Sequence, residues 1–127
     1  HKKVVVIDER SEMSGYDLGY NTDVLKNYPK ARGIEIAVRT LSPEVIICDE
    51  IGSVKEAEEL CALVNCGVKF IVTIHCSELY ELKRKPQFTA LSDAGAAEAC
   101  IFLNVKDFSI KKILLNKSWK ENRMKLL

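Results

Sequence analysis

Residues 45–50 read VIICDE: three β-branched residues and a cysteine lead directly into the paired acids Asp49 and Glu50. A short apolar run of this kind is typical of a strand that is covered on both faces, as in a parallel sheet. Gly52 follows at once and allows the chain to turn. The carboxyl ends of parallel strands meet at one edge of a sheet, and ligands bind in the crevice there. The stretch therefore predicts a buried parallel strand that presents two carboxylates at a ligand-binding edge.

Two further apolar runs end in the same way. Residues 4–7 (VVVI) lead into Asp8 and Glu9, and residues 70–74 (FIVTI) lead into His75. If all three runs are parallel strands, their carboxyl ends gather four acids and an imidazole along one rim.

The segments between these runs have helical spacing. Residues 29–41 place apolar side chains at i, i+3, i+4 and i+7 after Pro29, which suits a first helical turn. Ser53 and Glu56 form a capping-box pattern at the start of a second helix, which Gly67 ends. We expect shorter helices capped by Ser77 and over residues 87–94. This alternation favours parallel βαβ units.

The remaining segments are a loop and two strands. Residues 11–21 are rich in Ser, Gly, Asn and Asp, so a loop is expected after the first strand. Residues 100–103 form a fourth strand, and residues 110–115 form a fifth that pairs back on it. The sequence thus predicts an α/β fold with a mostly parallel sheet.

Composition and charge exclude some classes. The chain has 127 residues, enough for one domain, and a formal net charge of +1, which gives no general argument for nucleic acid or an anionic membrane as a partner. The basic stretch from Lys106 onward is expected to be a solvated end. No apolar run reaches the roughly 20 residues of a membrane span, and we expect a cytoplasmic protein.

The five cysteines are expected to be reduced core thiols. The chain does not begin with Met, and we expect it to be part of a longer protein.

The pair Asp49-Glu50 after a hydrophobic strand is an arrangement that phosphoryl-transfer enzymes use. The first acid holds magnesium through water, and its neighbour orients or deprotonates the attacking water. Strand-end acids also occur as helix caps. Several carboxylates on one rim repel each other unless a cation neutralises them, and Arg10 and Arg39 are candidates for that role. Structural ion pairs are the alternative for both arginines.

Two further side chains could take part. His75 could donate a hydrogen bond to a phosphate or a water, although a lone histidine can equally be structural. Arg84 could reach a phosphate on a neighbouring subunit, as arginine fingers do, or simply be solvated at a helix end. The sequence contains no G-x-x-x-x-G-K-[ST] phosphate loop.

A set of short motifs occurs in a fixed order between about residues 4 and 104. They are residues 6–12 (VIDERSE), 22–25 (TDVL), 29–31 (PKA), 39–46 (RTLSPEVI), 49–52 (DEIG), 65–69 (NCGVK), 73–75 (TIH) and 82–86 (LKRKP). In this order they resemble the stage III sporulation protein AA family, which belongs to the RecA-like ATPases and is related to the hexameric secretion ATPases. The loop after Glu12 is shorter than in that family.

The resemblance implies a three-layer RecA-like (P-loop ATPase) sheet, mostly parallel, that lacks the P-loop strand. Residues 1–127 would form the carboxyl-terminal part of that ATPase domain. ATP and Mg²⁺ would be the cofactors of the intact protein. Asp49 would be the Walker B metal ligand, and Glu9, Glu50 and His75 would be catalytic. The arginines considered above, Arg10, Arg39 and Arg84, are then the candidates for contacting the nucleotide.

The resemblance also implies partners. The intact protein would be a homo-oligomer, a hexamer, that drives assembly or transport at a membrane together with membrane proteins of a sporulation assembly. No nucleic acid is expected. It would be cytoplasmic, held at the membrane through its partners.

In the family, a Walker A loop and its helix precede the segment that begins at Lys3, and the strand of that loop lies beside the histidine-bearing strand. Without it we expect this chain to bind ATP very weakly or not at all, and to be inactive alone. We also expect residues 100–103 and 110–115 to close up against the third strand, or a second copy to supply the missing edge.

Two other functions are compatible with the residues. One is an α/β interaction module without a phosphate loop, which binds a partner through the rim or the basic end. The other is a metal-dependent phosphoesterase built on Asp8, Glu9, Asp49 and Glu50.

Overall fold

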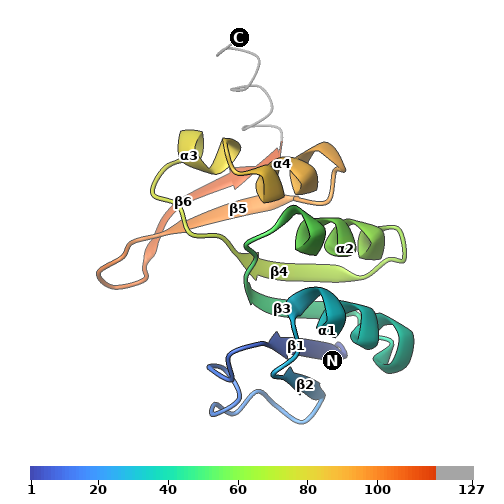
Figure 1. Cartoon of the computed structure of the whole chain (residues 1–127). Coiled ribbons are helices and arrows are strands. Elements are labelled where there is room, and N and C mark those ends of the chain that lie inside the picture. Colours follow the sequence, from blue (N-terminus) through green and yellow to red (C-terminus); the bar gives the residue numbers. More distant parts are fainter. Residues whose placement is uncertain (117–127) are drawn as a thin grey trace.

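The computed structural model describes residues 1–116 of the chain. It contains a four-stranded sheet covered by helices and a separate two-stranded sheet (Figure 1). The elements in chain order are β1 (Val4–Asp8), β2 (Thr22–Lys26), α1 (Lys30–Ile36), the π-helical turn η1 (Ala37–Leu41), β3 (Val45–Glu50), α2 (Val54–Val64), β4 (Lys69–Thr73), α3 (Leu79–Lys83), α4 (Pro86–Asp93), β5 (Ala99–Leu103) and β6 (Ile110–Leu115).

The four-stranded sheet is entirely parallel, with the order β2-β1-β3-β4. Val5 of β1 lies beside Ile46 of β3, which lies beside Phe70 of β4. The predicted parallel strands are therefore confirmed, and their carboxyl ends share one edge. The edge strand β2 was not predicted. Its side chains are half-buried or exposed, because an edge strand of five residues does not need the continuous apolar run of a central one.

One face of this sheet carries the core. Inward-facing residues of β1 and β3 pack against α1, α2 and α4, and the most completely buried of them include Val5, Ile7, Ile46 and Cys48. The helices supply Ile34, Leu60 and Leu91 to the same cluster. The predicted amphipathic helices are confirmed by this packing.

The helices α1, α2 and α4 lie on the same side of the sheet in Figure 1. Within residues 1–116 these helices form one layer on this face of the sheet, and the three-layer RecA-like arrangement stays a prediction. In the sheet order β2-β1-β3-β4, the chain moves one way from β1 to β2 and the opposite way from β2 to β3 and from β3 to β4. Because such connections are right-handed, the connection from β1 to β2 belongs on the face of the sheet opposite to α1 and α2. That connection, residues 9–21, forms turns and no helix. Ile71 on β4, which alternates with the inward-facing Phe70 and Val72, is 60% exposed.

The pairing of β5 with β6 is confirmed, and it is antiparallel. The expectation that these strands close up against β4 is wrong: β5 and β6 form their own sheet. One face of this hairpin packs against helices. Leu114, Cys100 and Phe102 pack with Leu82 of α3 and Phe88 of α4. A second copy beside β4 stays a prediction.

Caps and turns fix the ends of the helices. Ser53 Oγ accepts a hydrogen bond from the Glu56 N–H (3.2 Å), as predicted, and the Glu56 carboxylate accepts one from the Gly52 N–H (2.8 Å). These bonds hold the chain immediately after β3. The predicted cap at Ser77 is wrong, because the Ser77 N–H donates to the Glu81 carboxylate and α3 begins after Glu78.

The remaining expectations concern the cysteines and the chain end. All five cysteines are free thiols; Cys48 is buried, but Cys66 is exposed at the turn after α2, so it is not a core residue. The last part of the basic stretch, residues 117–127, lies outside the described residues. Among the residues described, no helix has the length and apolar character that a membrane crossing requires.

Candidate functional site

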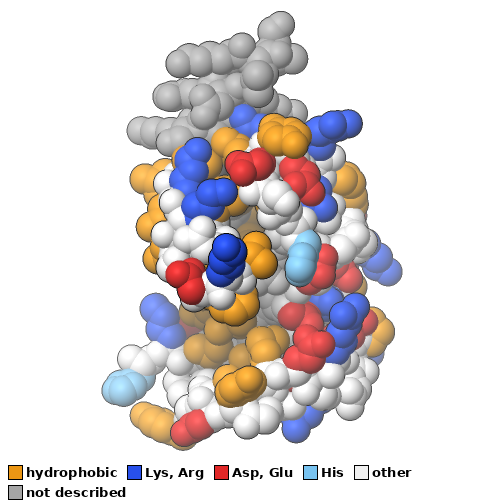
Figure 2. All heavy atoms as spheres, turned by 90° about the vertical axis from the view of Figure 1, so that its left-hand side faces the viewer, with side chains coloured by type: hydrophobic (Ala, Val, Ile, Leu, Met, Phe, Trp, Pro, Cys, Tyr) orange, Lys and Arg blue, Asp and Glu red, His pale blue; other side chains and the backbone are white. Residues whose placement is uncertain are grey.

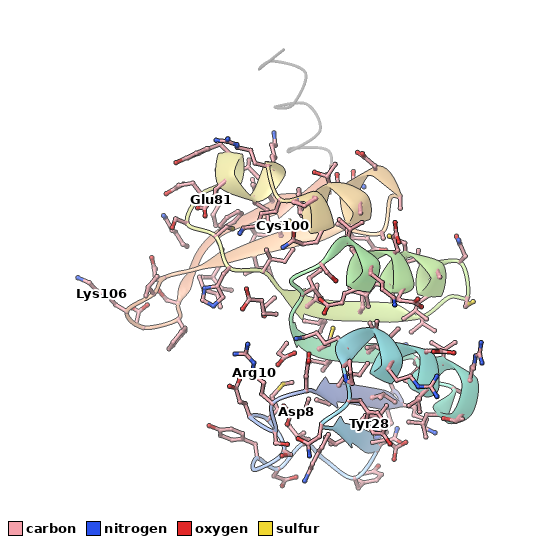
Figure 3. All side chains as sticks on the ribbon, viewed as in Figure 1. Asp8, Arg10, Tyr28, Glu81, Cys100 and Lys106 are labelled. Atoms are coloured by element: carbon pink, nitrogen blue, oxygen red, sulfur yellow. The ribbon has the colours of Figure 1, made fainter. Side chains whose placement is uncertain are left out.

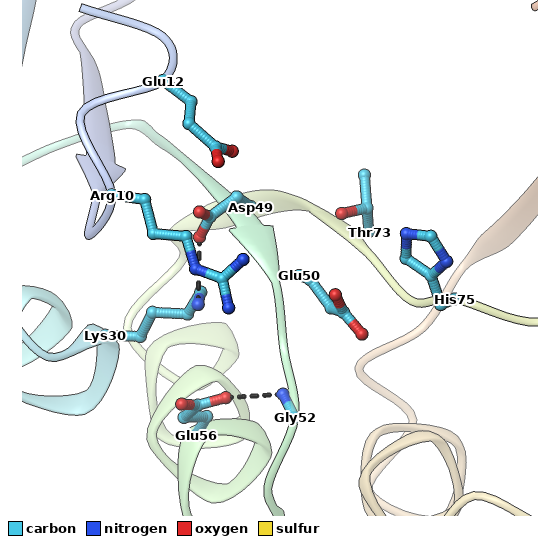
Figure 4. A pocket seen from close by; sticks show the side chains of 9 residues that line it. All are labelled: Arg10, Glu12, Lys30, Asp49, Glu50, Gly52, Glu56, Thr73 and His75. Atoms are coloured by element: carbon cyan, nitrogen blue, oxygen red, sulfur yellow. Dashed lines mark hydrogen bonds and ion pairs between the residues drawn. The ribbon is translucent and has the colours of Figure 1, made fainter.

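A polar pocket of about 430 Å³ lies where β3 and β4 end. Figure 2 views this edge of the molecule, where acidic side chains and a histidine gather beside a hollow. Figure 4 shows the pocket from close by. The residues that line it are Arg10, Glu12, Lys30, Asp49, Glu50, Gly52, Glu56, Thr73 and His75.

The two acids of β3 face different parts of this pocket. The pairing of β3 with β4 shifts register between Cys48 and Glu50, and Glu50 lies beside Thr73. Such a local bulge redirects side chains at the end of a strand. In Figure 4, Glu50 is on the side of Thr73 and His75, whereas Asp49 is on the side of Lys30 and Arg10. One acid is thus placed with a cation and the other with the imidazole.

Lys30 connects two acids of the site. Its Nζ lies 3.0 Å from Glu9 Oε2 and 3.1 Å from Asp49 Oδ1, and only 9% of its side chain is exposed. Burial alone would lower the pKa of this ammonium, but the hydrogen bond to Glu9 and the charges of Glu9 and Asp49 outweigh burial and hold the pKa above its ordinary value. Lys30 is therefore a charged group at the centre of the acid cluster.

Asp8 is not part of the rim. It is fully buried, and its carboxylate accepts hydrogen bonds from the backbone N–H groups of Glu12 (2.9 Å), Met13 (3.0 Å) and Ser14 (2.9 Å). Burial raises the pKa of this carboxyl, but the three N–H donors outweigh it and lower that pKa below its ordinary value. The prediction of four carboxylates on one rim is thus wrong for Asp8, because its carboxylate binds the backbone of the loop after β1 instead.

The fold of this loop places two charged residues at the pocket. Arg10 and Glu12 follow Asp8 and line the same cavity as Asp49. Figure 3 shows Asp8 and Arg10 close together at the end of β1. Asp8 therefore positions the first segment of the site, even though its own carboxylate does not reach the pocket.

The other two arginines lie elsewhere. Arg39 is on η1, with 76% of its side chain exposed, and it pairs with Glu35 at 3.3 Å. Arg84 is an exposed residue at the end of α3, and it does not line the pocket. Arg39 was a candidate to neutralise the acids, but Lys30 neutralises Glu9 and Asp49 instead. Of the sequence-predicted set, the structure brings together Arg10, Asp49, Glu50 and His75, with Glu9 attached through Lys30.

The donor set at Asp49 suits a hard cation that keeps most of its water. Asp49 Oδ1 is buried and receives no hydrogen bond of good geometry, although Lys30 lies beside it. Within residues 1–116, no three Asp, Glu, His or Cys side chains gather in a way that could hold a metal by themselves. A carboxylate or two plus water and substrate oxygens is how proteins usually bind Mg²⁺. Burial raises the pKa of the neighbouring Cys48 thiol to about 12, and Cys48 packs in the core and does not line the pocket.

Sequence reasoning missed Lys30, Glu12 and Glu56 as pocket residues. For Glu12 and Glu56 no pattern distinguishes a pocket carboxylate from a loop residue or a cap. For Lys30 a signal was present, since a lysine directly after Pro29 stands at the first residue of a helix, where the helix dipole favours an acid.

The chain matches known proteins along most of its length. The family model described as "Sporulation stage III, protein AA" matches residues 2–121. Stage III sporulation protein AA of Bacillus subtilis (strain 168) is 33% identical over 109 residues, which cover 80% of this chain and 36% of that protein. The uncharacterized protein ycf45 of Cyanidium caldarium is 28% identical over 102 residues, which cover 71% of this chain and 29% of that protein.

The matched region is thus about a third of each of these curated relatives. The match nevertheless runs through the whole site, from the loop after β1 to His75. This chain belongs to the sporulation stage III protein AA family.

Proposed function

We propose that this chain is the Walker B and sensor half of a RecA-like ATPase domain, whose intact form binds and hydrolyses ATP with Mg²⁺. The observation that carries the proposal is the pocket at the ends of β3 and β4, which gathers Asp49, Glu50, His75 and Arg10. A metal-binding acid, a second acid for water, and cationic groups for phosphate are the parts that phosphoryl transfer requires.

Each side chain has a role that suits its place. Asp49 would hold Mg²⁺ through water, and the ion would neutralise charge on the phosphate oxygens. Glu50 is exposed to the pocket and would accept a proton from the attacking water. His75 is on the same side of the pocket and would donate a hydrogen bond to a phosphate oxygen. Glu9 would orient the water from the far side of Lys30, and Arg10 would bind phosphate.

The break between the two sheets supports a RecA-like arrangement. In such folds the phosphate-loop strand lies between the histidine-bearing strand and the next one. Here β4 bears His75 at its end, and β5 does not pair with it. A strand from outside this sequence would fit beside β4, cover Ile71 and bring the phosphate-binding backbone to Asp49.

The proposal includes an assembly. The intact ATPase would be a homo-oligomer, a hexamer, in which Arg84, an exposed residue that does not line the pocket of its own chain, would reach the nucleotide of a neighbouring subunit. It would be cytoplasmic and would act on membrane-protein partners of a sporulation assembly to drive assembly or transport.

The test is ATP hydrolysis by the product of the complete reading frame, in which we expect a G-x-x-x-x-G-K-[ST] loop upstream of Lys3. We expect hydrolysis that requires Mg²⁺ and falls at least about 100-fold in D49N. The matched control is D23N, since Asp23 lies on the edge strand β2 and pairs only loosely with Lys3 (3.7 Å). Equal hydrolysis in D49N and D23N would contradict the proposal.

A protein-interaction module is the second candidate. The outer face of the β5–β6 hairpin is apolar and exposed; its members are Ile101, Leu103, Ile110, Ile113 and Leu115. An exposed apolar patch of this kind commonly marks a contact surface. A complete reading frame without a phosphate loop would favour this candidate. The metal-dependent phosphoesterase has less support, because one of its four acids, Asp8, is buried and binds the backbone of the loop after β1.

A further inference from the structure

Lys30 stands in an unfavourable place for a lysine. It is the first residue of α1, where the helix dipole is positive, and the helix has no side-chain cap. Its ammonium is also withdrawn from water, which costs free energy unless the charge is compensated. A residue that violates two local rules at a candidate site is expected to serve that site.

The compensation comes from Glu9 and Asp49. Glu9 belongs to the connection after β1 and Asp49 to the end of β3, and the ammonium lies within 3.1 Å of an oxygen of each. A divalent cation bound between these two segments would be coordinated by the same two oxygens, Glu9 Oε2 and Asp49 Oδ1. Because the ammonium already balances part of their charge, an arriving cation gains less from the pair.

The room that the Lys30 ammonium takes up also weakens cation binding at Asp49. Mg²⁺ requires near-octahedral coordination and keeps several waters, and the Lys30 ammonium, 3.1 Å from Asp49 Oδ1, occupies space beside this oxygen that the ion or one of its waters would take. Binding of a cation at Asp49 is therefore tighter when Lys30 moves away from this oxygen. Arg10, which lines the same pocket, adds further positive charge near the same acids.

We propose that Lys30 is a built-in counter-ion that competes with a divalent cation for Asp49 and Glu9, so that these acids bind the free cation weakly while the ammonium is in place. The inference rests on the proposed function only in taking Asp49 as the residue that holds the cation.

The test is Mn²⁺ binding to the chain without nucleotide, measured by electron paramagnetic resonance of free Mn²⁺. K30M should bind Mn²⁺ on the order of tenfold tighter than wild type, because two carboxylates lose their neutralising partner. K30R keeps the charge and should bind as weakly as wild type. The matched control is K69M, which removes an exposed lysine paired with Glu98 and should change nothing.

The double variant K30M/D49N checks the location of the gain and should bind no better than wild type. Unchanged or weaker binding in K30M, or a gain that survives in K30M/D49N, would overturn the proposal. Circular dichroism establishes whether each variant is folded.

A second measurement needs no variant. Acylation of lysine amines in the wild-type chain, followed by mass spectrometry, should show Lys30 becoming more reactive as Mn²⁺ saturates the site, whereas Lys69 stays constant. Equal reactivity of Lys30 with and without Mn²⁺ would overturn the competition even if K30M does not fold. Neither measurement contains ATP, so the competition and the proposed ATPase activity can fail independently.

Discussion

Nζ of Lys30 lies 3.1 Å from Oδ1 of Asp49, which ties the first turn of α1 to the end of β3. The same ammonium donates to Glu9, 21 positions away in the chain. The connection after β1, the start of α1 and the end of β3 are therefore held together by one buried cation. These are three of the segments that form the candidate site, so the stability of the fold and the geometry of the pocket depend on the same contacts.

Replacing Asp8 should loosen the loop that carries Arg10 and Glu12. In D8N the loop N–H groups lose a charged acceptor, and we expect a loss of about 2–3 kcal/mol in the free energy of unfolding at pH 7. Urea unfolding measures this value. D23N, at an exposed aspartate, is the control and should change it by less than about 0.5 kcal/mol.

Asp8 should also make the wild-type protein acid-sensitive. Its pKa is lowered in the folded state, so its contribution to stability is present above the unfolded-state pKa of about 3.9 and is lost as the pH falls through the folded-state value. In D8N the dependence of unfolding free energy on pH below about 4 should be shallower. A D8N curve parallel to that of wild type would show that Asp8 does not carry this effect.

Gly33 should not tolerate a methyl group. A Cβ at this position would lie 2.8 Å from Cγ2 of Ile7, a fully buried and stiff β-branched side chain. We expect G33A to lower the free energy of unfolding by about 1–3 kcal/mol, even though alanine favours helices. G15A, where nothing lies within 4 Å, is the control. A G33A variant as stable as wild type would mean that α1 lies farther from β1.

Thiol reactivity should follow burial. Cys66 is exposed and should react first with iodoacetamide at pH 8. Burial raises the pKa of Cys48 to about 12 and that of Cys100 to about 11, so both should react slowly in the folded protein and quickly in urea. Mass spectrometry of digested samples gives the order. Rapid labelling of Cys48 without denaturant would contradict the packing of β3 against α1 and α2.

Arg10 should contribute to nucleotide affinity in the intact protein. Because it lines the pocket, R10A should weaken the binding of MgATP on the order of tenfold. R32A, which removes an exposed arginine paired with Glu35 at 2.9 Å, is the control. Binding measured with a fluorescent ATP analogue distinguishes the two, and equal affinities would exclude a direct contact of Arg10 with phosphate.

The convergence of Asp49, Glu50 and His75 could be predicted because parallel strands with strongly apolar sequences place their carboxyl ends together. Asp8 shows the limit of that reasoning. An acid at a strand end has the same sequence pattern whether it faces the rim or turns back to accept N–H groups of the following loop. The Ser- and Gly-rich loop after β1, which needs acceptors for its backbone, is the only signal that separates the two.

Lys30 and β2 were missed for a different reason. The unfavourable place of Lys30 at the start of a helix is visible in the sequence, but the direction of its side chain follows from how α1 packs on β1, a contact between segments that a linear pattern does not contain. The strand β2 has few apolar residues. It is a strand because it pairs with β1, and its own composition does not indicate one. The position of the β5–β6 hairpin depends in the same way on its packing against α3 and α4.

We propose that Glu50 acts on the water that attacks ATP at this pocket. The most direct measurement compares MgATP binding with ATP hydrolysis in E50Q of the intact protein, with E58Q on the exposed surface of α2 as the matched control. We expect E50Q to bind MgATP like wild type but to hydrolyse it at least about 100-fold more slowly, while E58Q does both normally. Normal hydrolysis by E50Q would contradict this role of Glu50.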